Sequence, residues 1–275
     1  MLENLFFDWY SASIDRPVVE VIERLRSEYP HLSLEMARPK NGYTHADKLV
    51  DQVGATVITL MYGGSAQGTK VNVTATGKDA HKFAEVIRVL YPQHELVRAD
   101  VAIDFDESGA WQSLVSHGLM VSRRAKIKNR YVGPADAIMS DDSPDGRTLY
   151  VGSRQSVSMV RVYEKGRKDD PDRPDWVRAE FEFKPKGAVG RERFALATPA
   201  QIVSSTPVGR AFFETLVGSV EVLPVPAGKL RAKTDHERAM TALRRQYGKT
   251  LLVELERCGG SVDDFVASLL AGIAA

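Results

Sequence analysis

Short runs of alternating apolar and polar positions occur along the chain, separated by stretches with helical spacing. Period-two alternation predicts strands at residues 6–15, 33–37, 55–64, 69–77, 95–107, 126–132, 147–154, 158–166 and 176–186. Apolar spacing of three and four predicts helices at 18–29, 78–92, 108–119, 189–196, 199–217, 235–247, 249–257 and 261–273. The polar stretches 38–51, 134–147 and 168–175 are interpreted as loops.

The second half of the chain repeats the plan of the first. An ungapped offset of 89 residues places Asp15 on Asp104 and Val73 on Val162, and this one register holds over two separated segments. A duplicated unit explains this, although chance similarity between strands is the alternative. We therefore predict an α+β fold of duplicated β-α-β-β units, with antiparallel sheet, helices on one side and a C-terminal helical segment. The expected domains are 1–223, with pseudo-repeats at about 1–92 and 93–197, and an appendage at 224–275.

Composition narrows the classes of protein. With 37 basic and 36 acidic residues the formal net charge is +1, which excludes a uniformly cationic DNA-coating protein but not a local basic patch. The single cysteine excludes an internal disulfide framework and a cysteine-rich zinc site. No apolar run approaches the ~20 residues of a membrane span, and no secretory signal is visible. We expect a cytoplasmic protein without a membrane partner.

Three strands of the second half separate polar from apolar residues by parity. Each apolar set can line a core, because side chains on a strand alternate between faces. Neighbouring strands would then bring the polar sets together: Arg98, Asp100 and Asp104; Arg161, Tyr163 and Lys165; Arg178, Glu180 and Glu182. A solvated face with salt bridges is one explanation. Acidic residues are poor strand formers, however, and four carboxylates on one face repel unless cations or a metal neutralise them.

A metal beside a tyrosine indicates phosphoryl transfer. Mg²⁺ or Mn²⁺ takes oxygen ligands of this kind and would polarise a scissile phosphate. A tyrosine oxygen that attacks a phosphodiester forms a covalent phosphotyrosine and divides one difficult step into two. Lys165 or Arg161 would stabilise the phenolate or the developing phosphate charge.

The runs GRTLYVGSRQSVSMVRVYEKG and WVRAEFEFK, with RADVAIDF about 50 residues before YVGSR, resemble the replication initiation factor family. That family includes rolling-circle initiators of staphylococcal-type plasmids and filamentous phages, and related relaxases of conjugative elements. QYGKTLLVELERCGG resembles the helical tail of its phage-type members. The resemblance extends over roughly residues 5 to 260, with its core motifs between 98 and 184.

The resemblance implies metal-dependent, origin-specific nicking and closing of one DNA strand through a 5′-phosphotyrosine. It makes Tyr163 the nucleophile, with Lys165, Arg161 and Arg178 around it. The implied metal ligands are Asp100, Asp104, Glu180 and Glu182. A conjugative relaxase that nicks a transfer origin, or a DNA-binding regulator without nicking activity, are the alternatives. The short chain, without an extra N-terminal DNA-binding domain, favours a small phage or plasmid initiator over a relaxase.

Other candidate residues fit this chemistry less well. Tyr150 is the rival nucleophile, for which we favour a structural role, and Tyr10 and Tyr131 are weaker rivals. No two of the six histidines lie two residues apart, so the paired-histidine metal site of other rolling-circle nucleases is absent. This absence supports a metal site made of carboxylates alone.

Basic residues cluster in two segments. One is the run 123–130 and the other is 229–249, and either could contact phosphates or be a solvated basic face. The expected DNA contacts are Arg123, Arg124, Lys126, Lys128, Arg130 and Arg154. The expected partners are double-stranded origin DNA with a single-stranded or hairpin nick site, a host helicase and polymerase, and a second copy of the chain in a homodimer.

Overall fold

A computed structural model describes residues 4–65, 67–134, 136–140, 146–217 and 235–271. The chain divides into two compact units, Met1–Gly228 and Lys229–Ala275. The domain boundary predicted at 223/224 falls outside the described residues. Within the described residues, no helix is both long enough and apolar enough to cross a membrane.

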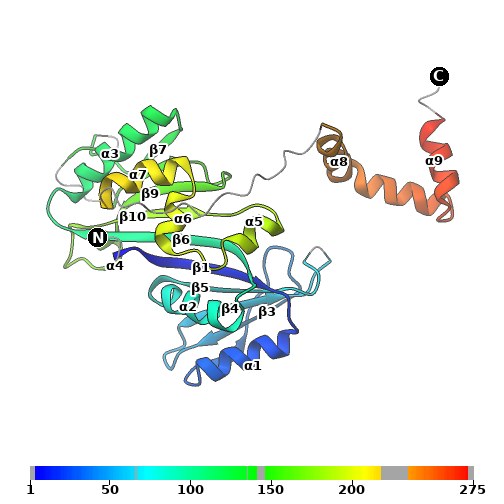
Figure 1. Cartoon of the computed structure of the whole chain (residues 1–275), viewed down its shortest axis with the longest axis horizontal. Helices are drawn as coiled ribbons and strands as arrows, with labels where there is room; N and C mark the ends of the chain where they lie inside the picture. The colour runs from blue at the N-terminus through cyan, green and yellow to red at the C-terminus, as the bar shows by residue number, and fades with distance from the viewer. Residues whose placement is uncertain (1–3, 66, 135, 141–145, 218–234, 272–275) are drawn as a thin grey trace. The chain divides into compact units, whose positions relative to one another are not determined.

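The first unit is built on a ten-stranded antiparallel sheet in the order β2-β3-β4-β5-β1-β6-β10-β9-β8-β7 (Figure 1). The strands of its first half are β1 (Phe6–Ile14), β2 (Ser33–Met36), β3 (His45–Val50), β4 (Thr56–Tyr62) and β5 (Val71–Thr76). The strands of its second half are β6 (Glu95–Asp106), β7 (Asn129–Val132), β8 (Thr148–Gly152), β9 (Ser158–Glu164) and β10 (Trp176–Phe183). The two halves meet at the antiparallel pair β1 and β6.

Helices cover one face of this sheet. They are α1 (Val18–Glu28), α2 (Ala80–Leu90), α3 (Ala110–Ala125), α5 (Ala188–Arg193), α6 (Pro199–Ser204) and α7 (Pro207–Val217). In α2 the buried residues Ala80, Phe83, Ala84 and Ile87 recur at helical spacing and meet the apolar positions of β1 and β5. Leu114 of α3 belongs to the same buried cluster. We call the opposite face of the sheet the outer face.

The second unit contains α8 (Asp235–Arg257) and α9 (Val262–Leu270). Two glycines with positive φ, Gly259 and Gly260, end α8. The backbone N–H of Asp264 donates to the Ser261 side chain at 3.3 Å, so Ser261 is the N-cap that its position predicts. The antiparallel sheet with helices on one side and the C-terminal helices confirm the α+β fold.

The topology of the two halves is the same, but each unit is larger than β-α-β-β. In both halves the first strand is followed by a helix and four more strands, and the last strand returns to pair with the first. The offset of 89 residues places β5 on β9, whereas their positions in the sheet make β10 the counterpart of β5 and β9 that of β4. Unequal loop lengths cause this difference, since an ungapped offset cannot follow them.

The helix predicted at 108–119 continues to Ala125 as α3, and three other local predictions differ from the structure. The stretch 38–51 contains β3. The first two residues of the connector 168–175 belong to a short helix, α4 (Lys165–Asp169), which begins directly at the end of β9. Residues 235–257 form one helix instead of two, because Gly248 lies inside α8 without ending it.

Candidate active site

The outer face of the second half brings together the polar residues that strand parity predicts. Across β6, β10 and β9, Asp104 lies opposite Arg178, which lies opposite Tyr163. In the next row Glu180 lies opposite Arg161, and in the third Glu182 lies opposite Asp100. Directly paired residues of antiparallel strands point to the same face, so these side chains form one cluster.

Arg178 holds one side of the cluster. Its Nε and Nη2 donate to the two carboxylate oxygens of Asp104 at 2.6 and 2.7 Å, and its Nη1 donates to Asp8 at 2.6 Å. Asp8 lies where the register of β1 against β6 shifts between Phe7 and Trp9. This irregularity turns Asp8 toward the cluster, where simple alternation did not place it.

Arg98 holds the other side. It donates to Asp100 at 2.8 and 2.5 Å, and its Nη2 lies 2.9 Å from Glu182. Lys184 also pairs with Glu182, at 2.6 Å. The carboxylate of Asp100 is therefore paired with an arginine of its own strand, and that of Glu182 with Arg98 of the neighbouring strand and with Lys184 just after its own strand.

Tyr163 lies in the middle of the cluster. Its hydroxyl donates to Oε2 of Glu180 at 3.2 Å, and Arg161 pairs with the other oxygen of this carboxylate. Burial raises the pKa of Tyr163 well above its usual range, the negative charge of Glu180 raises it further, and Arg178 opposes the shift. The phenol consequently holds its proton in this arrangement, and the nearest acceptor for that proton is Glu180.

Asp100 and Glu180 form a buried carboxylate pair. Each side chain is only about 1% exposed. Burial raises the pKa of Asp100, and the adjacent Glu180 contributes to the shift against the effect of Arg98. The guanidinium groups of Arg98 and Arg161 pair with these two carboxylates. Mg²⁺ is commonly bound by one or two carboxylates plus water and phosphate oxygens. The donor chemistry of this pair fits a hard divalent cation.

The other two predicted ligands lie beside this pair. Asp104 is held by Arg178, and Glu182 by Arg98 and Lys184. Among the described residues, no three histidine, cysteine, aspartate or glutamate side chains are grouped closely enough to hold a metal ion. Any metal at Asp100 and Glu180 would therefore take its remaining ligands from water or substrate.

With this geometry established, comparisons with known proteins identify the family. The model of the replication initiation factor family matches residues 94–270, more than half of the chain and the whole of the cluster except Asp8. The chain belongs to the replication initiation factor family. The fold is similar to that of a rolling-circle replication initiator protein from Geobacillus stearothermophilus. That match has a TM-score of 0.53 and 20% identity, and it covers 73% of this chain and 83% of the other. No curated protein matches the sequence.

Metal dependence is general among replication initiation factors, which agrees with the predicted Mg²⁺ or Mn²⁺.

Lys165, the first residue of α4, pairs with Asp169, and its Nζ lies 5.1 Å from the ring centroid of Trp176. Trp176 precedes Arg178 by two residues on the outer face. The contacts of this ammonium group are therefore Asp169 and Trp176, and its predicted role at Tyr163 stays a prediction.

The rival tyrosines have different environments in this initiation factor. Tyr10 is fully buried on the helix side of the sheet, where its hydroxyl donates to the Ala195 carbonyl at 3.0 Å and lies 2.7 Å from His94. The Tyr131 hydroxyl donates to the Pro134 carbonyl at 3.0 Å. Tyr150 lies on the outer face, opposite Arg161. Tyr150 is therefore the rival closest to the cluster.

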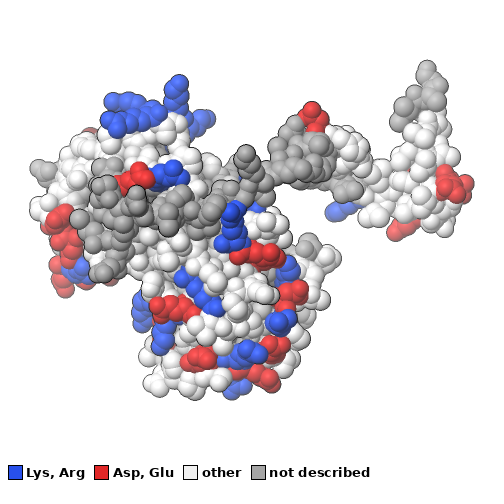
Figure 2. Space-filling view, viewed as in Figure 1, with Lys and Arg blue, Asp and Glu red and all other residues white. Residues whose placement is uncertain are grey.

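The predicted DNA contacts lie at the end of α3, at the edge strand β7 and in the turn between β8 and β9. Arg123 and Arg124 end α3, and Lys126 follows in a left-handed conformation with φ of 53°. Figure 2 shows this group of basic side chains at the end of α3. All six predicted residues are exposed: Arg123, Arg124, Lys126, Lys128, Arg130 and Arg154. Of the second basic segment, residues 229–234 lie outside the described residues, and the rest belongs to α8.

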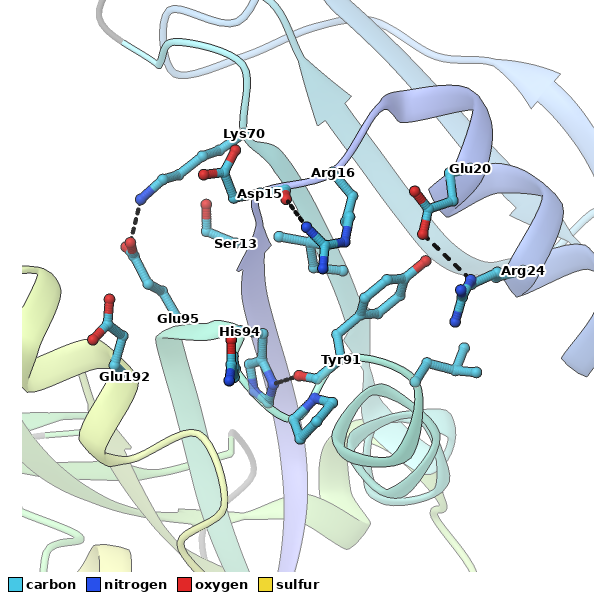
Figure 3. Close-up of a pocket in the computed structure, with 14 residues that line it drawn as sticks. Ser13, Asp15, Arg16, Glu20, Arg24, Lys70, Tyr91, His94, Glu95 and Glu192 are labelled. Carbon is cyan, nitrogen blue, oxygen red and sulfur yellow. Dashed lines mark hydrogen bonds and ion pairs between the residues drawn. The ribbon is translucent and has the colours of Figure 1, made fainter.

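A hollow of about 520 Å³ lies away from the cluster and is lined by residues of both halves, among them Asp15 after β1, Glu95 of β6 and Glu192 of α5. Figure 3 shows that its charged groups pair with one another, Lys70 with Glu95 and Arg24 with Glu20. Its lining carries four acidic residues and three basic ones, which disfavours a polyanionic ligand. We therefore place the candidate active site on the outer face of the second half.

Proposed function

We propose that this protein starts rolling-circle replication by nicking one strand of an origin with Tyr163 and later closing it. The observation that carries the proposal is the Tyr163 phenol, which is hydrogen-bonded to a buried carboxylate and lies beside Arg161 and Arg178. Few other arrangements on a sheet face combine a nucleophile, an acceptor for its proton and several cations for a phosphate.

The chemistry balances over two steps. Tyr163 Oη attacks the phosphorus of a phosphodiester, its proton passes to Glu180, and the bond from phosphorus to the 3′ oxygen breaks. The 5′ phosphate stays on the tyrosine, and the released 3′ hydroxyl takes up a proton and can prime synthesis. Attack by a 3′ hydroxyl on the phosphotyrosine reverses these bonds and closes the strand.

The cationic side chains around Tyr163 would act on the negative charge of the phosphate. The guanidinium groups of Arg161 and Arg178 and the ammonium of Lys165 would stabilise the additional negative charge on the phosphate oxygens in the transition state. Asp100 and Glu180 would hold a divalent cation, which when bound supplies Lewis-acid polarisation of the phosphate. Asp104 and Glu182 would orient Arg178 and Arg98, and they remain candidates for additional ligands.

In this proposal residues 1–223 form the catalytic nicking domain, and residues 224–275 form a helical appendage. The expected substrate is double-stranded origin DNA whose nick site is single-stranded or in a hairpin. A host helicase and polymerase would act on the nicked product, and a homodimer would place two sites on one origin.

A nicking assay on supercoiled DNA carrying the cognate origin, with Mg²⁺ or Mn²⁺, tests this function. We expect Tyr163→Phe to abolish nicking and the covalent adduct while DNA binding remains, and EDTA to stop nicking by the wild type. An adduct on Tyr163→Phe would refute the assigned nucleophile, and nicking that resists EDTA would refute the metal. Binding without any nicking by the wild type would favour a silent regulator, and nicking at a transfer origin alone would favour a relaxase.

A further inference from the structure

Tyr150 carries two arginines over its ring. The guanidinium carbons of Arg130 and Arg154 lie 5.1 and 5.5 Å from the ring centroid, and Nη2 of Arg154 lies 3.3 Å from the Tyr150 hydroxyl. Arg130 is opposite Tyr150 in the register of β7 and β8, and Arg154 lies in the turn that follows Gly152. The backbone carbonyl of Arg154 accepts from Lys184 at 2.7 Å, which holds that turn near the end of β10.

These two arginines differ from the others on the outer face. Arg98, Arg161 and Arg178 also lie over aromatic rings, but each is bound to at least one carboxylate. In the part of the chain that the structure describes, neither Arg130 nor Arg154 forms an ion pair with an acidic side chain. Their charges are therefore available to an external phosphate.

The position of Tyr150 links it to Tyr163. Tyr150 is opposite Arg161, and Tyr163 is opposite Thr148, so the two tyrosines are diagonal neighbours on adjacent strands. Such neighbours lie about 7–8 Å apart, which is comparable to one nucleotide step of an extended single strand. A strand whose phosphate lies at Tyr163 can therefore place an adjacent base at Tyr150.

We propose that Tyr150, Arg130 and Arg154 bind the nucleotide next to the cleaved phosphate, with its base on the Tyr150 ring and its phosphates at the arginines. The proposal rests on the function proposed above, because Tyr163 marks the cleaved phosphate. It commits to single-stranded DNA, since a base inside a duplex offers no free face for stacking. Tyr150 is then a positioning residue, not a second nucleophile.

Binding of a fluorescein-labelled oligo(dT), followed by anisotropy in the Tyr163→Phe background, tests this without cleavage. Loss of one base–aromatic stack weakens binding roughly 5- to 150-fold, and we expect this range for Tyr150→Ala and Tyr150→Leu. Tyr150→Phe keeps the ring and should bind within about twofold of its parent. Arg130→Ala and Arg154→Ala should each lower the salt slope of log K by about 0.7, the value for one phosphate contact on a single strand.

Two matched controls come from the first half. Tyr62→Ala removes a half-buried tyrosine that bonds Asp47 and no arginine, and Arg26→Ala removes an exposed arginine on α1, on the helix side of the sheet. Neither should change binding. Tyr150→Leu keeps an apolar side chain at the position. If Tyr150→Leu and Tyr150→Ala both lose affinity for oligo(dT) while Tyr150→Phe does not, the loss is due to the missing aromatic ring and not to misfolding.

Three results would overturn the proposal. Tyr150→Ala and Tyr150→Leu could bind oligo(dT) as well as their parent, or only duplex DNA could respond to these substitutions. In the presence of Tyr163, Tyr150→Phe could lose the covalent adduct, which would make Tyr150 the nucleophile. A wild type that never nicks, while its Tyr150 variants still lose single-strand binding, would refute the proposed function and leave this binding site intact.

Discussion

A buried ion pair fixes the two strands that carry Tyr150 and Tyr163. Arg147, which precedes β8, and Glu164, which ends β9, are 1% and 4% exposed. Two bonds of 2.9 and 2.7 Å join the guanidinium to the carboxylate, and the backbone N–H of Arg147 donates to the same group at 2.9 Å. The guanidinium also donates to the carbonyls of Ala137 and Ser140 at 2.7 and 2.8 Å.

Arg147→Met is expected to lower the free energy of unfolding by about 4 kcal/mol. Removing one partner of a buried pair costs about 3–5 kcal/mol, because the remaining charge is left without compensation. Arg167 stays 3.2 Å from Glu164 and reduces that penalty. The carbonyls of Ala137 and Ser140 keep other donors, the Ser140 N–H and the Gln112 side chain, so their loss of Arg147 adds little. Replacing both partners removes the buried charge, so Arg147→Met/Glu164→Met should recover about 2 kcal/mol of the loss.

Urea unfolding followed by circular dichroism measures these differences, provided that one m value fits all variants. Arg24→Met is the matched control, since Arg24 pairs with Glu20 at 3.4 Å on the surface and should cost less than about 1 kcal/mol. A loss below about 1 kcal/mol for Arg147→Met would show that solvent reaches the pair. A double variant no more stable than the single would show that the uncompensated charge is not the cause.

Three other experiments test separate features. Burial lowers the pKa of His94 from 6.5 to about 4, so on acidification the unfolded chain takes up a proton before the folded chain does. The free energy of unfolding should therefore fall by roughly 3 kcal/mol as the pH is lowered from 6.5 to 4. Thermal melts of His94→Gln should lack this pH dependence. Mg²⁺ at ten times its Kd should stabilise the wild type by about 1.4 kcal/mol, and equal stabilisation of Asp100→Asn would contradict the metal assignment. A Cβ on Gly209 would lie 2.1 Å from the Val203 carbonyl oxygen, so Gly209→Ala should destabilise by about 1–3 kcal/mol in urea. Gly190→Ala, with open space around the new methyl, should be neutral or stabilising, and an equal loss there would argue against the clash.

Strand parity predicted the outer face because alternation is a local property of an extended backbone. It could not predict which carboxylate each arginine takes, since that depends on register between strands far apart in sequence. Asp8 was missed for this reason, because an irregularity in β1 turns it toward Arg178. The broken alternation of FFDWY was the available signal.

The same limit applies to the ion pair. Glu164 has the parity of the apolar residues Val160 and Val162, which marks it as an anomaly in the sequence. Nothing local identifies Arg147 as its partner, because the pairing follows from the register of β8 and β9. The β3 strand was missed because Asp47 and Lys48 weaken its apolar pattern.

The return of the last strand of each half to its first strand has a consequence for synthesis on the ribosome. The first half contains all the partners of β1 except β6, so its five strands can assemble before the rest of the chain emerges. The second half closes only when β10, the last of its strands along the chain, emerges to pair with β6, which until then has β1 as its neighbour. A nascent chain that stops before Trp176 can therefore have a folded first half, but it lacks Arg178, Glu180 and Glu182 of the outer-face cluster.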